Sequence, residues 1–205
     1  PPADSQEMML AERIYRQNAS IEDIAVAELP PVFPTPLRYE VTSSAFELDG
    51  DVTIVADTIF TDEANYLQAE LGNVLSAAPN IVTEQAEGKT IYISHKPLTE
   101  AEGYELTVDA SGVRVEAATP AGAFYGIQSL IQLIPPPAWK AKQSTIQLAG
   151  VHITDAPRFG HRAVMLDVAR NFQTKEQVLK ILDLLAHYKI NVMHFHFSED
   201  EAWRL

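Results

Sequence analysis

PRFGHRAVMLDVARNFQTKEQVLKILDLLAHYKINVMHFHFSEDEAWRL, residues 157–205, is the stretch that decides the fold. It holds two short apolar runs, at 163–168 and 190–197, with a segment of helical pattern between them. Short continuous apolar runs are typical of strands that are buried on both faces of a parallel sheet. The stretch therefore predicts a βαβ unit, in which a crossover helix joins two parallel strands.

The helix of this unit has a defined start and one apolar face. Thr174 is followed three residues later by Gln177, which is the pattern of a capping box. The apolar residues that recur at helical spacing are Val178, Ile181, Leu182, Leu185 and Ala186. A single βαβ unit cannot bury both faces of its own sheet, so we expect further chain to complete this architecture.

Polar side chains follow both predicted strands. Asp167 and Arg170 come at the end of the first run, and Glu199-Asp200-Glu201 follow the second. In βα folds the chemistry is carried by the loops at the C-terminal ends of the strands. The sequence therefore predicts a functional site at this edge.

The composition restricts the partners of the 205-residue chain. Its formal net charge of −13 argues against nucleic acid and against an anionic membrane surface. The sequence has no cysteine, which excludes disulfides and thiolate metal sites within it. No run reaches the roughly 18 apolar residues that a membrane-spanning helix needs.

The sequence opens on Pro1 without a basic-then-apolar leader. We expect an exported protein (periplasmic, cell-surface or secreted) whose signal has been removed or was never included.

Upstream of the βαβ stretch, the sequence predicts an arm and an α+β domain. Residues 1–36 form the arm, with a weakly amphipathic segment at 5–16 and a proline-rich segment at 30–36 that favours extended chain. Residues 37–156 form the domain. Its expected strands are 37–41, 52–56, 90–94, 104–108, 113–117 and 144–153, with turn chemistry at 47–51.

The turns, helices and core of this domain carry specific expectations. Residues 109–112 are expected to close a hairpin, with Gly112 at a position of positive φ. One helix is expected at 62–77. A second helix should begin after Thr119 as its cap, with Pro120 in the first position, and should end at the prolines 135–137. Phe124 and Tyr125 are expected in the core.

Two segments resemble glycoside hydrolase family 20, the β-N-acetylhexosaminidases. GYELTVDASGVRVEAATPAGAFYGIQSLIQL (103–133) is similar to the family's N-terminal α+β domain. DAPRFGHRAVMLDVARNF (155–172), together with KINVMHFHFSEDEAWR (189–204), is similar to the first two strands of its catalytic barrel. The resemblance implies an α+β domain with an antiparallel sheet and packed helices at 37–156. The start of a truncated (β/α)8 TIM barrel would follow at 157–205.

The resemblance also implies an activity. Family 20 enzymes remove terminal N-acetyl-β-D-hexosamine residues with retention, and the 2-acetamido oxygen of the substrate attacks the anomeric carbon. An aspartate steadies the acetamido nitrogen, and an adjacent glutamate protonates the leaving oxygen. This pair follows the fourth barrel strand in a glycine-rich context, which neither Asp62-Glu63 nor Asp200-Glu201 matches. The pair is therefore expected beyond this chain, and the chain alone is expected to be inactive.

Arg170 is the expected sugar-binding residue. In Asp-Val-Ala-Arg-Asn-Phe it matches the family arginine that holds the 3- and 4-hydroxyls of the sugar. A planar fork of donors suits two neighbouring hydroxyl oxygens. The sequence departs from the family at Asn171, where a histidine is usual. The implied partners are a glycan that ends in an N-acetylhexosamine and the remainder of the barrel, and no cofactor is implied.

Further side chains are expected to support this site. Glu199 and Asp200 match the paired acids of the family after the second strand, although the first is usually aspartate. Asp167 is expected to form an ion pair or hydrogen bond inside the barrel, as is Arg162. His196 shares one strand face with His194 and is expected to pack and support.

Two other function classes remain as alternatives. His-x-His on a barrel strand also occurs in metal-dependent hydrolases. The sequence places no further histidine or acid ligand on a second strand, so we expect no metal. The domain at 37–156 could also be a non-catalytic carbohydrate-binding or scaffold module.

Overall fold

The computed structural model describes residues 12–22, 31–84, 86–200 and 202–203. The chain divides into two compact units, residues 1–30 and 31–205. In the first unit residues 12–18 are helical, and Arg16 pairs with Glu12 one turn earlier. The remainder of the helix expected at 5–16 lies outside the described residues.

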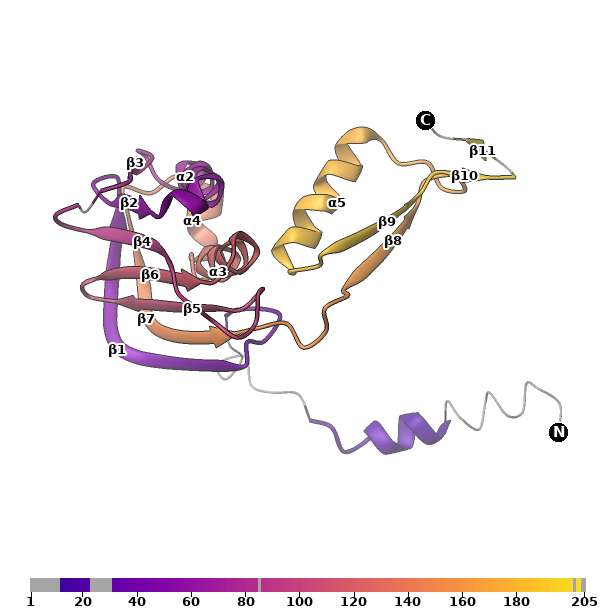
Figure 1. The fold of residues 1–205 in the computed structure, drawn as a ribbon. Coiled ribbons are helices and arrows are strands. Elements are labelled where there is room, and N and C mark those ends of the chain that lie inside the picture. The colour runs from indigo at the N-terminus through magenta and orange to yellow at the C-terminus, as the bar shows by residue number, and fades with distance from the viewer. Residues whose placement is uncertain (1–11, 23–30, 85, 201, 204–205) are drawn as a thin grey trace. The chain divides into compact units, whose positions relative to one another are not determined.

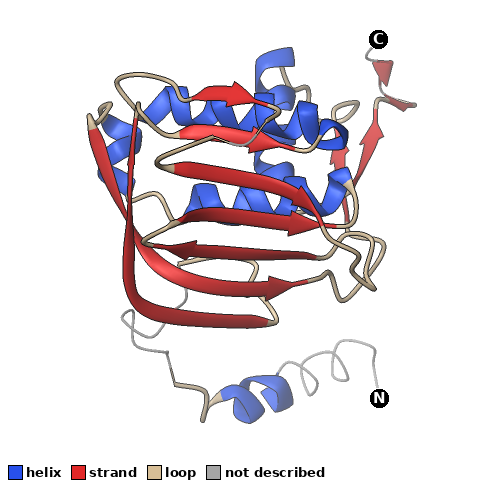
Figure 2. Ribbon diagram, turned by 60° about the vertical axis from the view of Figure 1, so that its left-hand side comes forward, coloured by secondary structure: helices blue, strands red, loops and turns tan. Residues whose placement is uncertain are grey.

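In the described residues from 31 onward, a seven-stranded sheet forms the centre of the second unit (Figures 1 and 2). Its strand order is β1 (Arg38–Asp49), β7 (Thr145–Asp155), β5 (Tyr104–Asp109), β6 (Gly112–Ala117), β4 (Thr90–His95), β2 (Thr53–Ala56) and β3 (Asn80–Val82). The expected antiparallel pairing joins β1, β7, β5 and β6. From β6 outward, β4, β2 and β3 pair in parallel, so the sheet is mixed.

Helices cover one face of the sheet and close the core. They are α2 (Thr61–Val74), α3 (Pro120–Gln132) and the short α4 (Pro136–Lys140). The predicted cap of α3 is confirmed, because the Thr119 hydroxyl accepts a hydrogen bond from the Gly122 amide. The fully buried side chains between the sheet and the helices include Ile54, Leu67, Leu71, Ile93, Leu106 and Ile127.

The hairpin between β5 and β6 follows the prediction. Asp109 pairs with Gly112, and the Asp109 carboxylate accepts a hydrogen bond from the Ser111 amide at 2.7 Å. Gly112 has a φ of 153°, and a Cβ there would lie 2.6 Å from the carbonyl oxygen of Thr90. Glycine is therefore required at this position both by conformation and by space.

Strand β1 corrects the sequence interpretation. We expected it to end at Val41, but it continues to Asp49. The turn expected at 47–51 is present at Gly50 and Asp51. The register with β7 shifts between Val41 and Ala45, so the polar residues 42–44 bulge out opposite Gly150. A Cβ at Gly150 would overlap the side-chain oxygens of Thr42 and Ser44. The bulge interrupts the apolar alternation, and this made one strand look like a strand and a loop.

The proline run gave a second difference. Helix α3 ends at Gln132, before the three prolines, as expected. The prolines then open a further helix, α4, whose first residues are Pro136 and Pro137. Proline is tolerated in the first helical turn because its missing N–H would have no partner there.

The predicted βαβ unit is confirmed. β8 (Ala163–Asp167) and β9 (Val192–His196) pair in parallel, and α5 (Lys175–His187) connects them. Both halves of the capping box are present: Gln177 N donates to Thr174 Oγ1, and Thr174 N donates to Gln177 Oε1. A short hairpin of β10 (Ser198–Glu199) and β11 (Ala202–Trp203) follows.

The βαβ unit leaves much of its apolar surface uncovered within this chain. No residue of β8, α5 or β9 is fully buried. Met165 on β8 is 54% exposed, and Leu184 on α5 is 48% exposed. This is the state expected of one βαβ unit without the rest of a barrel.

Among the described helices, none has both the length and the apolar character needed to cross a membrane.

We expect Gly150→Val in the 205-residue chain to destabilise the fold by about 1–3 kcal/mol, because the added side chain must displace the bulge of β1. Urea unfolding followed by circular dichroism measures the change. Gly160→Ala is the matched control, since a Cβ at Gly160 meets nothing within 4 Å. Its effect should stay within about 0.5 kcal/mol. Equal destabilisation by the two substitutions would contradict the account of the bulge.

Candidate functional site

The predicted edge of the βαβ unit brings four side chains together. Asp167 is the last residue of β8 and pairs in register with His196, the last residue of β9. Val168 N donates to His196 O at 2.9 Å, so the pairing continues past the strand ends. Arg170 and Glu199 follow directly. We call Asp167, Arg170, His196 and Glu199 the Arg170 cluster.

Asp167 holds Arg170 in a fixed orientation. Its Oδ1 accepts from the backbone amides of Ala169 and Arg170 at 3.1 and 3.0 Å. Its Oδ2 contacts Nε and an Nη of the Arg170 guanidinium, each at 2.5 Å. The hydrogen bond from the Arg170 amide, followed by the one from its side chain, holds the pKa of Asp167 below its usual range. Asp167 thus binds the guanidinium through two of its nitrogens, while the Arg170 side chain remains 54% exposed.

Glu199 completes the cluster from the second strand. Its Oε1 lies 3.8 Å from an Nη of Arg170 and 3.1 Å from Nε2 of His196. His196 Nε2 is buried, and no described residue offers it a partner in hydrogen-bond geometry. The carboxylate therefore faces the guanidinium and the imidazole together, at ion-pair distance from both.

Asp200 and His194 lie apart from these contacts. Asp200 is exposed in the turn after β10. His194 is on β9 with its ring centroid 6.2 Å from that of His196. In the part of the chain that the structure describes, no three histidine, aspartate or glutamate side chains converge as metal ligands. The geometry thus gathers four of the five predicted side chains and leaves Asp200 at the rim.

Arg162 corrects the expectation of a lock inside the barrel. It precedes β8 and reaches back to the sheet domain, residues 31–156. Its guanidinium donates to Glu102 at 2.8 Å, to the Tyr125 hydroxyl at 2.9 Å and to the backbone oxygen of Lys189 at 2.7 Å. Tyr125 is largely buried as expected, but its hydroxyl serves this contact between the sheet domain and the βαβ unit.

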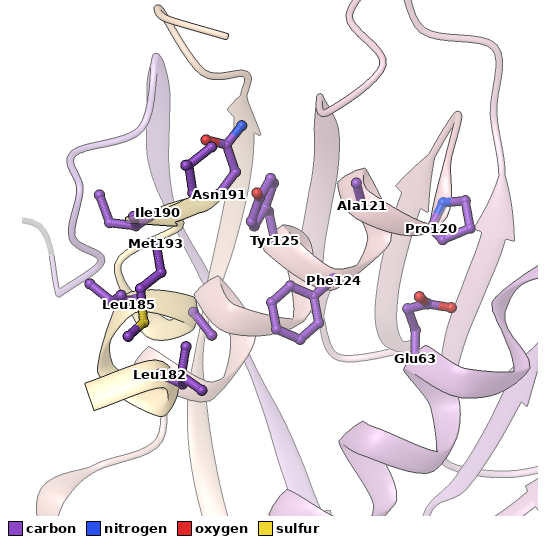
Figure 3. Close-up of a pocket in the computed structure, with 12 residues that line it drawn as sticks. Glu63, Pro120, Ala121, Phe124, Tyr125, Leu182, Leu185, Ile190, Asn191 and Met193 are labelled. Carbon is purple, nitrogen blue, oxygen red and sulfur yellow. The ribbon is translucent and has the colours of Figure 1, made fainter. Parts of the chain in front are cut away.

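A hollow of about 430 Å³ lies at the other end of β9 (Figure 3). It is lined by α3, α5 and the start of β9, including Phe124, Tyr125, Leu182, Leu185, Asn191 and Met193. Phe124 is only partly buried and faces this hollow, which corrects its assignment to the core. The hollow is mostly apolar and belongs to the contact between α5 and the sheet domain. It is not part of the Arg170 cluster, which follows the C-terminal ends of the strands.

Comparison with known proteins assigns the family. The model described as "Glycosyl hydrolase family 20, domain 2" matches residues 29–156, and "Glycosyl hydrolase family 20, catalytic domain" matches residues 159–205. The chain belongs to glycosyl hydrolase family 20. Its fold is therefore that of the family's domain 2 followed by the start of the catalytic TIM barrel.

Relatives of this family 20 chain extend well beyond its length. A β-hexosaminidase of Porphyromonas gingivalis is 35% identical over 184 residues, which cover 85% of this chain and 23% of that protein. A β-hexosaminidase of Vibrio vulnificus is 35% identical over 196 residues, covering 93% and 21%. The structure of an exo-β-N-acetylglucosaminidase from Vibrio harveyi in complex with N-acetylglucosamine matches with a TM-score of 0.76 at 28% identity, covering 89% and 28%. The chain spans about a quarter of the length of these relatives.

We expect the ion pair between Glu102 and Arg162 to give the unfolding free energy a specific dependence on pH. The hydrogen bond from Arg162 is the main cause that lowers the pKa of Glu102 below its ordinary 4.5. A carboxylate whose pKa is lowered by folding stabilises the protein fully above its ordinary pKa, and the contribution is lost as pH falls through the lowered value. The difference in stability between the wild type and Glu102→Gln should therefore be constant near neutral pH and shrink below about pH 4.5.

Urea titrations at several pH values between 3 and 7 measure this difference. The control is the same substitution in an Arg162→Met background, where the pH-dependent part should become smaller because the main cause of the lowered pKa is removed. A difference that stays unchanged down to pH 3 would contradict the assigned ion pair.

Proposed function

We propose that this chain is part of a β-N-acetylhexosaminidase, in which Arg170 binds the terminal N-acetyl-β-D-hexosamine residue of a glycan substrate. The observation that carries the proposal is the hydrogen-bonded ion pair of Asp167 with the Arg170 guanidinium at the C-terminal end of β8. The relatives named as β-hexosaminidases, and the Vibrio harveyi structure with bound N-acetylglucosamine, support the same substrate class.

The chemistry of the edge suits the recognition of sugar hydroxyls. A guanidinium carries five N–H donors in one plane. Two neighbouring hydroxyl oxygens of a pyranose match this planar fork. Asp167 fixes the plane of the guanidinium, so less side-chain freedom is lost when the sugar binds. Glu199 places a second carboxylate 3.8 Å from an Nη of the guanidinium.

The bond-breaking step would be substrate-assisted, with the 2-acetamido oxygen of the sugar as the nucleophile. The aspartate that orients the acetamido group and the glutamate that protonates the leaving oxygen are assigned to residues outside this chain. The chain's own side chains bind and orient the sugar. This division of roles makes two separate predictions.

Substitution of Arg170 tests its role in the full-length protein. Arg170→Ala should lower kcat/KM on a chromogenic N-acetyl-β-glucosaminide by at least about tenfold. Each lost hydrogen bond to a charged donor costs on the order of 1.5–3 kcal/mol, and 1.36 kcal/mol corresponds to a factor of ten. Arg170→Lys should restore little, because an ammonium cannot reproduce the fork. Arg38→Ala, which removes an exposed arginine of β1, is the control and should leave kcat/KM unchanged. Wild-type kcat/KM combined with a lowered Tm in Arg170→Ala would show a purely structural role.

The purified 205-residue chain should not hydrolyse the same substrate, because the acid and the orienting aspartate are assigned outside it. A release assay with the full-length protein as the positive control measures this. Turnover by the chain alone, in a preparation free of the full-length protein, would place the catalytic pair within these residues. Absence of activity in the full-length protein would favour the non-catalytic module.

A further inference from the structure

Lys189 extends from the βαβ unit into the sheet domain. It lies between α5 and β9, and its side chain is only 8% exposed. Nζ donates to the Tyr104 hydroxyl at 2.8 Å and to Asp155 Oδ2 at 2.9 Å. It also lies 4.8 Å from the centroid of the Tyr104 ring. The Tyr104 hydroxyl is in turn 2.6 Å from Ser129 Oγ on α3, so the ammonium ends in a network anchored on two strands and one helix.

The backbone of Lys189 has an uncommon conformation. Its φ of 59° places it in the left-handed region, just after the last turn of α5. Glycine is the usual residue at such a position, because a Cβ there costs free energy. Burial of the ammonium costs more free energy, and it lowers the pKa of Lys189 although Asp155 acts in the opposite direction. A lysine that carries both a left-handed backbone and a buried ammonium indicates that its place in the fold serves to position other groups.

Arg162 joins the same network from the other strand. Its Nε donates to the backbone oxygen of Lys189, and its backbone oxygen accepts from the amides of Asn191 and Val192, each at 3.1 Å. Its own amide donates to the Asn191 side chain at 2.9 Å. Arg162, directly before β8, and the start of β9 are therefore tied to each other and to the sheet domain. We call Glu102, Tyr104, Asp155, Arg162 and Lys189 the interdomain cluster.

Polar contacts are prominent between the βαβ unit and the sheet domain. No residue of β8, α5 or β9 is fully buried, and the apolar contacts of the βαβ unit with the sheet domain are made by partly buried side chains such as Leu185 and Ala186. The charged side chains of the interdomain cluster are mostly buried: its two cations and two carboxylates are between 8% and 25% exposed. Such pairs add little net stability, but they fix one geometry.

We propose that the interdomain cluster positions the Arg170 cluster, with Lys189 and Arg162 as positioning residues. The inference rests on the proposed sugar-binding role of Arg170. β8 and β9 are paired in register from Ala163 with Val192 to Asp167 with His196, so a shift at their first residues is transmitted to their last. The last residues set the separation of 3.8 Å between Arg170 and Glu199. The sheet domain thereby determines where the sugar-binding arginine lies.

The test uses the full-length protein and a double-mutant cycle. Lys189→Met keeps the length of the side chain and removes the ammonium. We expect it to lower kcat/KM on the chromogenic glycoside by about ten- to a hundredfold, as a small misplacement of a binding group does. In an Arg170→Ala background the same substitution should cost less than about threefold, because coupled residues are not additive. Lys142→Met, at an exposed lysine before β7, is the matched control and should change neither value.

Hydrogen exchange supplies a readout that does not depend on activity. Amides of 163–170 and 192–199 should exchange faster in Lys189→Met than in the wild type, and at the wild-type rate in Lys142→Met. Tyr104→Phe removes one acceptor and keeps the ring. It should show the same pattern at a smaller amplitude, and it serves if Lys189→Met does not fold.

Equal losses of kcat/KM in the wild-type and Arg170→Ala backgrounds would overturn the proposal, because Lys189 would then act only through general stability. Unchanged exchange at 163–170 and 192–199 would overturn it as well. If the full-length wild type has no glycosidase activity, the proposed function fails. In that case the exchange measurement alone decides whether the interdomain cluster positions the Arg170 cluster.

Discussion

The parallel pairing of β8 with β9 is the constraint on which the candidate site depends. Side chains alternate between the two faces of a strand, so a slip of one residue would move every side chain to the other face. The observed register sets Asp167 beside His196, and Val168 N then bonds to His196 O. Only with this register do Arg170, after β8, and Glu199, after β9, lie at the same edge of the strand pair. The capping box of α5 supports the register, because it fixes where the crossover helix begins.

Sequence patterns predicted what is determined locally. The capping box, the hairpin at Gly112 and the cap at Thr119 each involve residues within four positions of one another, and each was confirmed. The continuation of β1 was missed because it depends on Gly150, about a hundred residues away in the chain, which provides the space for the bulge. The parallel half of the sheet was missed for a similar reason, since strand order is not written in any local pattern.

The same distinction applies to the charged residues. Asp167 and Arg170 are three residues apart, and their pairing follows from a single turn. Lys189 is 85 residues from Tyr104, and Arg162 is 60 residues from Glu102, so no spacing in the sequence relates them. One signal was available: a lysine between an amphipathic helix and an apolar strand stands where glycine would be the ordinary residue. That signal indicates a special position but not the partner, which only the fold supplies.

The two charged clusters at opposite ends of β8 and β9 differ in what they do with their cations. In the interdomain cluster the carboxylates of the sheet domain hold Lys189 and Arg162 away from solvent, and the cost of burial is offset by hydrogen bonds to hydroxyls and backbone oxygens. In the Arg170 cluster a carboxylate on the same strand end holds an arginine that stays half-exposed. Burial favours a fixed geometry, whereas an exposed side chain can be reached by a ligand. A short, hydrogen-bonded strand pair joins the two, so rigidity at one end of β8 and β9 can give precision to recognition at the other.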